Sequence, residues 1–166
     1  VDSAGRVLHA AQVIPNEGAW VEIETAASGV ISVRIGQTRK FPVTALLRGL
    51  DWFEDIDDTL PPTGTDAEIL ECFGVRETVE MKQILKEMAD RERGSMPGAQ
   101  AHDVYYATSR HTDVEGAVAV EAYGRITESV AKALRKDGTE RLAVLRVPSQ
   151  IAATLEDDDT HTNKEG

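Results

Sequence analysis

The residues that could do chemistry in this sequence of 166 residues do not form a recognisable catalytic set. Its four histidines are His9, His102, His111 and His161. None has cysteine or carboxylate partners at the spacing of a zinc or two-histidine iron site. Positions 157–163 begin like a calcium loop, but Thr162 replaces the glycine of the sharp turn. Because the Walker, dinucleotide and nucleophile-elbow motifs are also missing, we expect no catalytic, cofactor-binding or metal-binding residues here.

Trp20 and a local concentration of positive charge form the chemical feature that does stand out. Positions 30–50 contain four basic residues and no acidic residue, whereas positions 51–72 contain eight acidic residues and no basic residue. An indole on a strand face stacks on an unpaired base, worth about 1–3 kcal/mol, while cationic groups attract phosphates. The candidate residues for contact with an unpaired base and its phosphates are therefore Trp20, Arg34, Arg39 and Lys40. The alternative is a tryptophan that another part of a larger protein covers.

Composition limits the remaining possibilities. The formal charge of −11 repels phosphate at long range, which disfavours free nucleic-acid binding by the chain alone. No apolar run approaches the roughly 20 residues of a membrane span, and no secretory signal is visible. The single cysteine, Cys72, lies on an apolar helical stripe, so we expect it in the core of a protein of the reducing cytoplasm. The absence of an initial methionine suggests an excised piece.

A small antiparallel sheet is expected at the start of the chain. Its strands are predicted at 7–14, 19–25 and 30–36. Apolar and polar residues alternate in the second and third strands, and we pair Val21 with Val33 so that their apolar faces match. This register places Trp20 opposite Arg34 on the polar, exposed face.

Three helices are expected to follow, with the acidic segment 51–64 as a surface loop. Pro42 begins the first helix, and Thr65 forms a capping box with Glu68 at the start of the second. Thr78 is expected to cap the third. The side chains predicted to face the core are Val43, Leu46, Leu47 and Leu50, then Ile69, Leu70 and Phe73, then Met81, Ile84, Leu85 and Met88.

The second half of the chain is expected to form another α+β unit. Strands are predicted at 103–108, 116–123 and 141–147, with a helix over 127–136. The polar tail 154–166 shows no core-forming pattern and is expected to be loose. The fold class is therefore α+β, a small antiparallel sheet with short packing helices plus a small α+β module.

The run VIPNEGAWVEIETAASGVISVRIGQTRKFPVTALLRGL, positions 13–50, resembles the lobe domain of the bacterial RNA polymerase β subunit. The GAW, VRI, RK and LLR elements stand in the family's order, and TLEDDDTHTNKEG resembles its TLEKDNT segment. The resemblance implies that the lobe part covers 1–75 and 153–166, inside a longer chain. Most of 76–152 resembles a lineage-specific insertion, an α+β module with helix 127–136 packed on a sheet.

The resemblance also implies a role in transcription. The lobe forms one wall of the DNA channel and contacts non-template and downstream DNA without catalysing nucleotidyl transfer. Trp20 would stack on an unpaired non-template base, and Arg34 would support the indole in that position. Arg39 and Lys40 would approach the DNA backbone. Glu17 and Gly36 replace an arginine and an aspartate of the family pattern. Phosphate attraction and base discrimination are therefore expected to be weaker here.

Further expectations follow from membership of such an enzyme. The polymerase is a nucleotidyltransferase that uses Mg, whereas this fragment would carry no active site and no cofactor. Its partners would be DNA and the α, β′, ω and σ subunits, in the cytoplasm with the nucleoid and not at a membrane. The alternative is a protein-docking module that recruits a transcription regulator or another subunit through the insertion.

Overall fold

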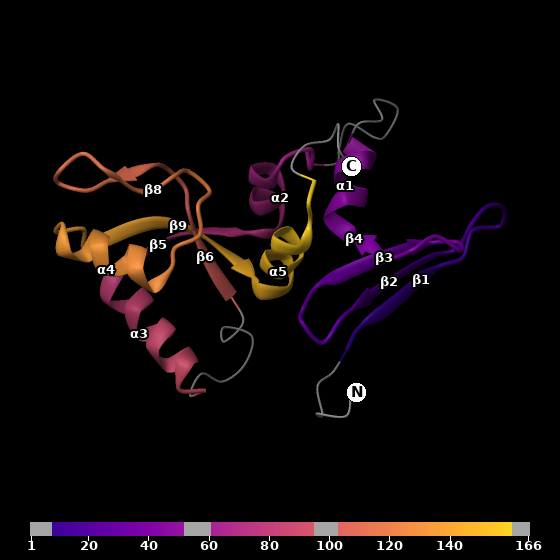
Figure 1. Ribbon diagram of the computed structural model, residues 1–166, viewed down its shortest axis with the longest axis horizontal. Coiled ribbons are helices and arrows are strands. Elements are labelled where there is room, and N and C mark those ends of the chain that lie inside the picture. Colours follow the sequence, from indigo (N-terminus) through magenta and orange to yellow (C-terminus); the bar gives the residue numbers. More distant parts are fainter. Residues whose placement is uncertain (1–7, 52–60, 95–102, 161–166) are drawn as a thin grey trace. The chain divides into compact units, whose positions relative to one another are not determined.

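The computed structural model of the chain describes residues 8–51, 61–94 and 103–160 (Figure 1). Helices and antiparallel strands occur together in these ranges, which confirms the expected α+β class. The chain divides into two compact units. Unit 1 is Val1–Cys72 with Ser149–Gly166, and unit 2 is Phe73–Pro148. Most of the predicted acidic loop lies outside the described residues.

Unit 1 contains a four-stranded antiparallel sheet. Its strands, in spatial order, are β1 (Ala10–Val13), β2 (Val21–Thr25), β3 (Ile31–Ile35) and β4 (Phe41–Pro42). The first three were predicted and are confirmed, the second and third from their alternating apolar residues, although each is shorter than expected. A tight turn joins β2 to β3, in which the amide of Ala26 donates to the carbonyl of Val30 at 2.8 Å. Gly29 occupies this turn with φ +92°, a conformation that glycine adopts without strain.

The predicted β2–β3 register is wrong by two residues. Val21 lies opposite Ile35 instead of Val33, and Arg34 lies opposite Glu22 instead of Trp20. A slip of two residues leaves every side chain on its own face, so the alternation of apolar and polar residues cannot distinguish the two registers. The turn after Thr25 decides between them, because it makes Thr25 and Ile31 the last pair.

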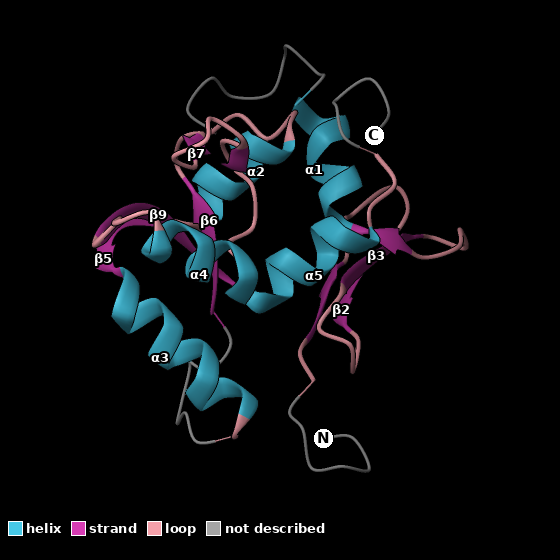
Figure 2. Cartoon of the chain, turned by 60° about the vertical axis from the view of Figure 1, so that its left-hand side comes forward, coloured by secondary structure: helices cyan, strands magenta, loops and turns pink. Residues whose placement is uncertain are grey.

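Two helices lie side by side in unit 1, and both contact β3 and β4 (Figure 2). They are α1 (Val43–Asp51) and α5 (Ser149–Asp157). The buried residues of α1 are Thr44 and Arg48, whereas Leu50 is exposed, so the predicted leucine stripe is not the most buried face. The prediction of a loose tail is wrong for the residues that form α5, and the Ile31 amide donates to Thr154 Oγ1 at 2.9 Å.

The helix α2 (Asp66–Phe73) begins with the predicted capping box. The amide of Thr65 donates to Glu68 Oε2 at 2.9 Å, and the amide of Glu68 donates to Thr65 Oγ1 at 3.3 Å. Ile69 and Leu70 are buried as expected. The core positions predicted for Phe73 and Cys72 are wrong, because both residues are exposed.

Unit 2 has a three-stranded sheet, a hairpin and two helices (Figure 1). The sheet is antiparallel in the order β5 (Val75–Glu80), β9 (Arg141–Pro148), β6 (Asp103–Ala107). The hairpin pairs β7 (His111–Thr112) with β8 (Val118–Val120), and the helices are α3 (Met81–Glu92) and α4 (Glu128–Lys136). The sequence did not predict β5. Thr78 lies in that strand, and the residue that precedes α3 is Glu80, whose side chain makes no capping hydrogen bond.

The core of unit 2 lies where α3 and α4 meet the sheet. Its buried members are Val79, Met81, Ile84, Tyr105, Ala107, Val120, Ile126, Ala131, Leu134, Leu142 and Val144. The predicted helix over 127–136 is confirmed, and the amide of Val130 donates to Thr127 Oγ1 at its start. None of the helices in the described ranges is long and apolar enough to span a membrane.

Candidate nucleic-acid interface

Trp20 lies immediately before β2, in the segment that connects β1 to β2 at one end of the sheet. Its side chain is 53% exposed, which confirms the predicted exposure. The carbonyl of Trp20 accepts a hydrogen bond from the amide of Gly36 at 2.8 Å, so the backbone holds the residue in the sheet. Val13 and Ile14 on the neighbouring segment are also exposed, at 55% and 60%. The indole therefore belongs to an apolar end of the sheet that is open to a ligand in this chain.

Arg34, the first predicted basic partner of Trp20, is engaged by a carboxylate of the same sheet. Its Nε donates to Glu22 Oε2 at 2.9 Å, and Nη2 contacts the same oxygen. Glu22 Oε1 accepts from Gln12 Nε2 at 3.1 Å. The hydrogen bonds and charge of Arg34 outweigh desolvation and hold the pKa of Glu22 below its ordinary value. The three residues form a polar row across β1, β2 and β3.

The other two predicted bases have different surroundings. Lys40 forms an ion pair with Glu24 of β2, and both side chains are nearly half exposed. Arg39 is exposed and forms no ion pair with any residue in the described ranges. Of the four candidates, Trp20 and Arg39 are thus available to a ligand without breaking an ion pair, while Arg34 and Lys40 are internally neutralised.

The basic strip predicted over 30–50 is consequently smaller than its sequence suggests. Its fourth base, Arg48, is fully buried and cannot meet a ligand at the surface. The prediction counted charges along the chain. It therefore missed Glu22 and Glu24 of β2, which precede the strip in sequence but form ion pairs with Arg34 and Lys40. Opposite charges on paired strands attract one another. The alternation of these glutamates with Val21 and Ile23 was the available signal.

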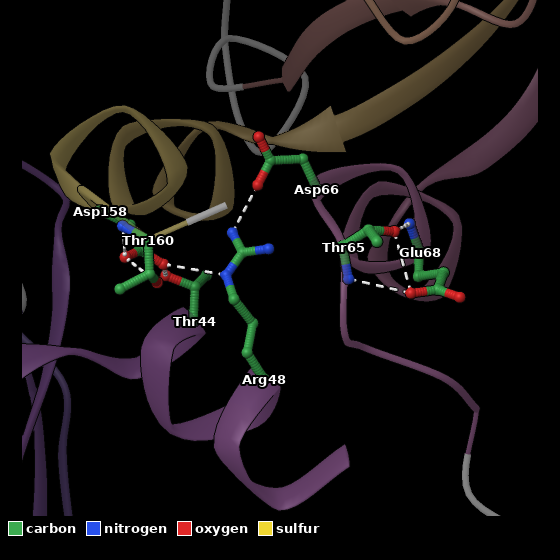
Figure 3. A network of polar contacts seen from close by, with 7 residues as sticks. All are labelled: Thr44, Arg48, Thr65, Asp66, Glu68, Asp158 and Thr160. Carbon is green, nitrogen blue, oxygen red and sulfur yellow. Dashed lines mark hydrogen bonds and ion pairs between the residues drawn. The ribbon is translucent and has the colours of Figure 1, made fainter. Parts of the chain in front are cut away.

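Arg48 belongs to a buried polar network that joins three segments of unit 1 (Figure 3). Its Nε donates to Asp158 Oδ2 at 3.4 Å, and its Nη2 contacts Asp66 of α2. Asp158 Oδ2 also accepts from Thr44 Oγ1 at 2.5 Å, and Oδ1 accepts from the amide of Thr160 at 2.9 Å. The network joins α1 to α2 and to the segment after α5, and both α1 and α5 contact β3 and β4 of the sheet.

The surroundings of Asp158 favour its charged form. Burial alone would raise the pKa of this carboxyl, but hydrogen bonds from Thr160 and Thr44 and the charge of Arg48 outweigh it. The pKa of Asp158 is therefore lower than usual. Among the residues that the structure describes, no group of three histidine, cysteine, aspartate or glutamate side chains could hold a metal ion.

Comparison with known proteins identifies relatives for about half of the chain. A β subunit of DNA-directed RNA polymerase from Clostridium botulinum strain Hall is 46% identical over 80 residues, which are 48% of this chain and 6% of the relative. The β subunit of Acetivibrio thermocellus is 46% identical over 79 residues, 48% of this chain and 5% of the relative. That of Clostridium acetobutylicum is 44% identical over 80 residues, with shares of 48% and 6%.

No protein-family model matches the chain. The chain also corresponds to only a small part of its relatives, about 6% of their length. Identity of 44–46% over about 80 residues nevertheless confirms the predicted resemblance to the β subunit of RNA polymerase. About half of this chain is homologous to a short segment of the β subunit of DNA-directed RNA polymerase.

Proposed function

We propose that unit 1 is part of the lobe of an RNA polymerase β subunit and that its Trp20 face contacts unpaired non-template DNA. The Trp20 face is the face of the sheet on which Trp20, Glu22 and Arg34 lie. The observation that carries the proposal is the half-exposed indole of Trp20 in a chain related to β subunits. An exposed aromatic side chain binds an unstacked base of any type. Arg39 forms no ion pair among the described residues, so its guanidinium is available to a phosphate of the DNA backbone next to that base.

In this proposal the chain is a wall of the DNA channel and not a catalytic centre. The nucleotidyltransferase activity and the Mg that serves it belong to the whole polymerase. The partners are DNA and the α, β′, ω and σ subunits, in the cytoplasm with the nucleoid. Residues 76–152 form an insertion within the lobe, and the compactness of unit 2 with its own core supports that division.

The test is made in intact polymerase that carries Trp20→Ala, with Trp20→Phe as the matched aromatic control. Loss of one base–aromatic stack, about 1–3 kcal/mol, corresponds to about 5- to 150-fold weaker open promoter complexes. The lifetime of these complexes after a competitor challenge measures the loss. Trp20→Phe should retain most of the stability. Open complexes of Trp20→Ala that last as long as those of the unmodified enzyme would contradict the proposal.

A second candidate function is a protein-docking module, and the β7–β8 hairpin of unit 2 favours it. Val114 at its turn is 80% exposed and Val118 is 41% exposed. Exposed apolar side chains that lie together on one surface form contacts with other proteins. A photocrosslinking residue at position 114 of intact polymerase tests this function. An adduct with a transcription regulator or polymerase subunit supports it, and adducts with DNA alone count against it.

A further inference from the structure

We propose that Glu22 and Glu24 make the Trp20 face selective for single-stranded over duplex DNA, because they neutralise Arg34 and Lys40. This inference rests on the proposed function, in which that face meets DNA. It assigns to the two glutamates a role in choosing the form of DNA that is bound.

The first neutralised pair is geometrically well defined. Glu22 and Arg34 are direct cross-strand partners in the β2–β3 ladder. Oε2 of Glu22 faces the guanidinium and Oε1 faces the amide of Gln12, so both carboxylate oxygens are occupied. A guanidinium held by a carboxylate presents little net charge to an approaching phosphate.

The second pair extends this neutralisation along the same strand. Glu24, two residues after Glu22, lies on the same face of β2 and forms the ion pair with Lys40. The side chains of Lys40 and Glu24 are 44% and 46% exposed, so a phosphate can reach Lys40 but must compete with Glu24 for it. At Arg34 a phosphate must compete with Glu22.

The charge of the surrounding unit does not compensate for this loss. Unit 1 contains six lysines and arginines against seventeen aspartates and glutamates, whereas unit 2 contains twelve of each. The entire formal excess of −11 therefore belongs to the unit that carries Trp20. Unit 1 therefore repels a polyanion at long range.

The two forms of DNA respond differently to such a face. A duplex offers its phosphates and hides the faces of its bases, so its binding without sequence preference depends on cations. A single strand also offers unstacked bases, whose contact with an indole does not require a free cation. Trp20 remains 53% exposed beside the neutralised pairs. The arrangement keeps the contribution of base stacking to the binding free energy and removes much of the contribution of phosphate contacts.

The test uses the full chain with a fluorescently labelled 12-nucleotide strand and a hairpin duplex of the same sequence. Binding is followed by anisotropy from 50 to 300 mM salt. Glu22→Gln and Glu24→Gln are each expected to raise duplex affinity several-fold at 50 mM. Each should make the slope of log K against log salt concentration steeper for duplex binding by up to about 0.9, the value of one additional phosphate contact. Affinity for the single strand should change less.

Asp159→Asn is the control for the change in net charge, because Asp159 lies in unit 1, is exposed and forms no ion pair with any residue in the described ranges. Duplex affinity and salt slope in Glu22→Gln and Glu24→Gln that match those of Asp159→Asn would overturn the inference. Circular dichroism of each variant verifies the sheet. Trp20→Ala tests the proposed function separately. If Trp20→Ala binds the single strand as well as the unmodified chain does, the proposed function fails, whereas an unmodified chain that binds neither form of DNA overturns the inference about Glu22 and Glu24.

Discussion

Arg48 and Asp158 meet in the interior of unit 1 although 110 residues separate them in the sequence. Their side chains are 0% and 1% exposed, and Arg48 Nε lies 3.4 Å from Asp158 Oδ2. The residues of unit 2 stand between them in the chain. The contact therefore joins the two sequence segments of unit 1, by connecting α1 to the residues that follow α5.

Removal of one partner from this pair should destabilise unit 1. Asp158→Asn leaves the buried guanidinium without its full counter-charge, a change that typically costs 3–5 kcal/mol. Because Asp66 remains beside Arg48, we expect a loss of about 3 kcal/mol, at the lower end of this range. Urea unfolding monitored by hydrogen exchange in α1 and α5 measures it. Asp159→Asn, at the exposed neighbouring position, should change stability by less than about 0.5 kcal/mol.

The same carboxylate predicts a specific dependence on pH. The pKa of Asp158 is lower in the folded protein than in the unfolded chain, so its charged form stabilises the fold. This contribution is complete above the unfolded pKa, roughly 3.9, and is lost as pH falls through the lower folded value. The stability difference between the unmodified chain and Asp158→Asn should thus be constant from pH 7 to pH 5 and shrink below about pH 4. A difference that grows on acidification would contradict this assignment.

Local signals predicted much of the fold. Alternation located β2 and β3, the Thr65–Glu68 spacing located the start of α2, and Thr127 located the start of α4. Each of these features depends on residues close together in the sequence.

The features that the sequence did not reveal depend on distant partners. Arg48 looked like a surface base because Asp158 lies 110 residues away. Arg34 looked free because Glu22 pairs with it only in the observed register. The strand β5 escaped notice because VRETVE has one buried residue, Val79, and pairs with β9 much later in the chain. Short apolar patterns do not encode such pairings.

The core of unit 2 predicts a large effect at Leu134. This side chain is 1% exposed and belongs to the buried cluster between α4 and the sheet. Leu134→Ala should reduce the stability of unit 2 by about 2–5 kcal/mol, because truncation leaves a cavity. Val114→Ala, at a position 80% exposed in the same unit, should change it by less than about 0.5 kcal/mol. Hydrogen exchange in α4 and β9 distinguishes the outcomes, and equal effects of the two changes would exclude Leu134 from the core.

The exposure of Cys72 predicts chemical accessibility. The sequence suggested a buried thiol, whereas the structure places this residue at the surface at the end of α2. Iodoacetamide should therefore alkylate Cys72 in native buffer to the same extent as in urea, as judged by intact mass. Cys72→Ser is the control that loses the adduct. Alkylation only after denaturation would show that the thiol is buried.

Trp20 provides the last prediction, because a binding residue and a core residue respond differently to truncation. Its side chain is 53% exposed, so Trp20→Ala should alter the stability of unit 1 by only about 0.5 kcal/mol. Val33 is fully buried in the same sheet, and Val33→Ala should cost more, roughly 1.5–3 kcal/mol. Urea unfolding of both variants, followed by circular dichroism and by hydrogen exchange in β2 and β3, makes the comparison. A loss of about 3 kcal/mol or more in Trp20→Ala would mark the indole as a packing residue. The same sheet would then have to bind DNA without it.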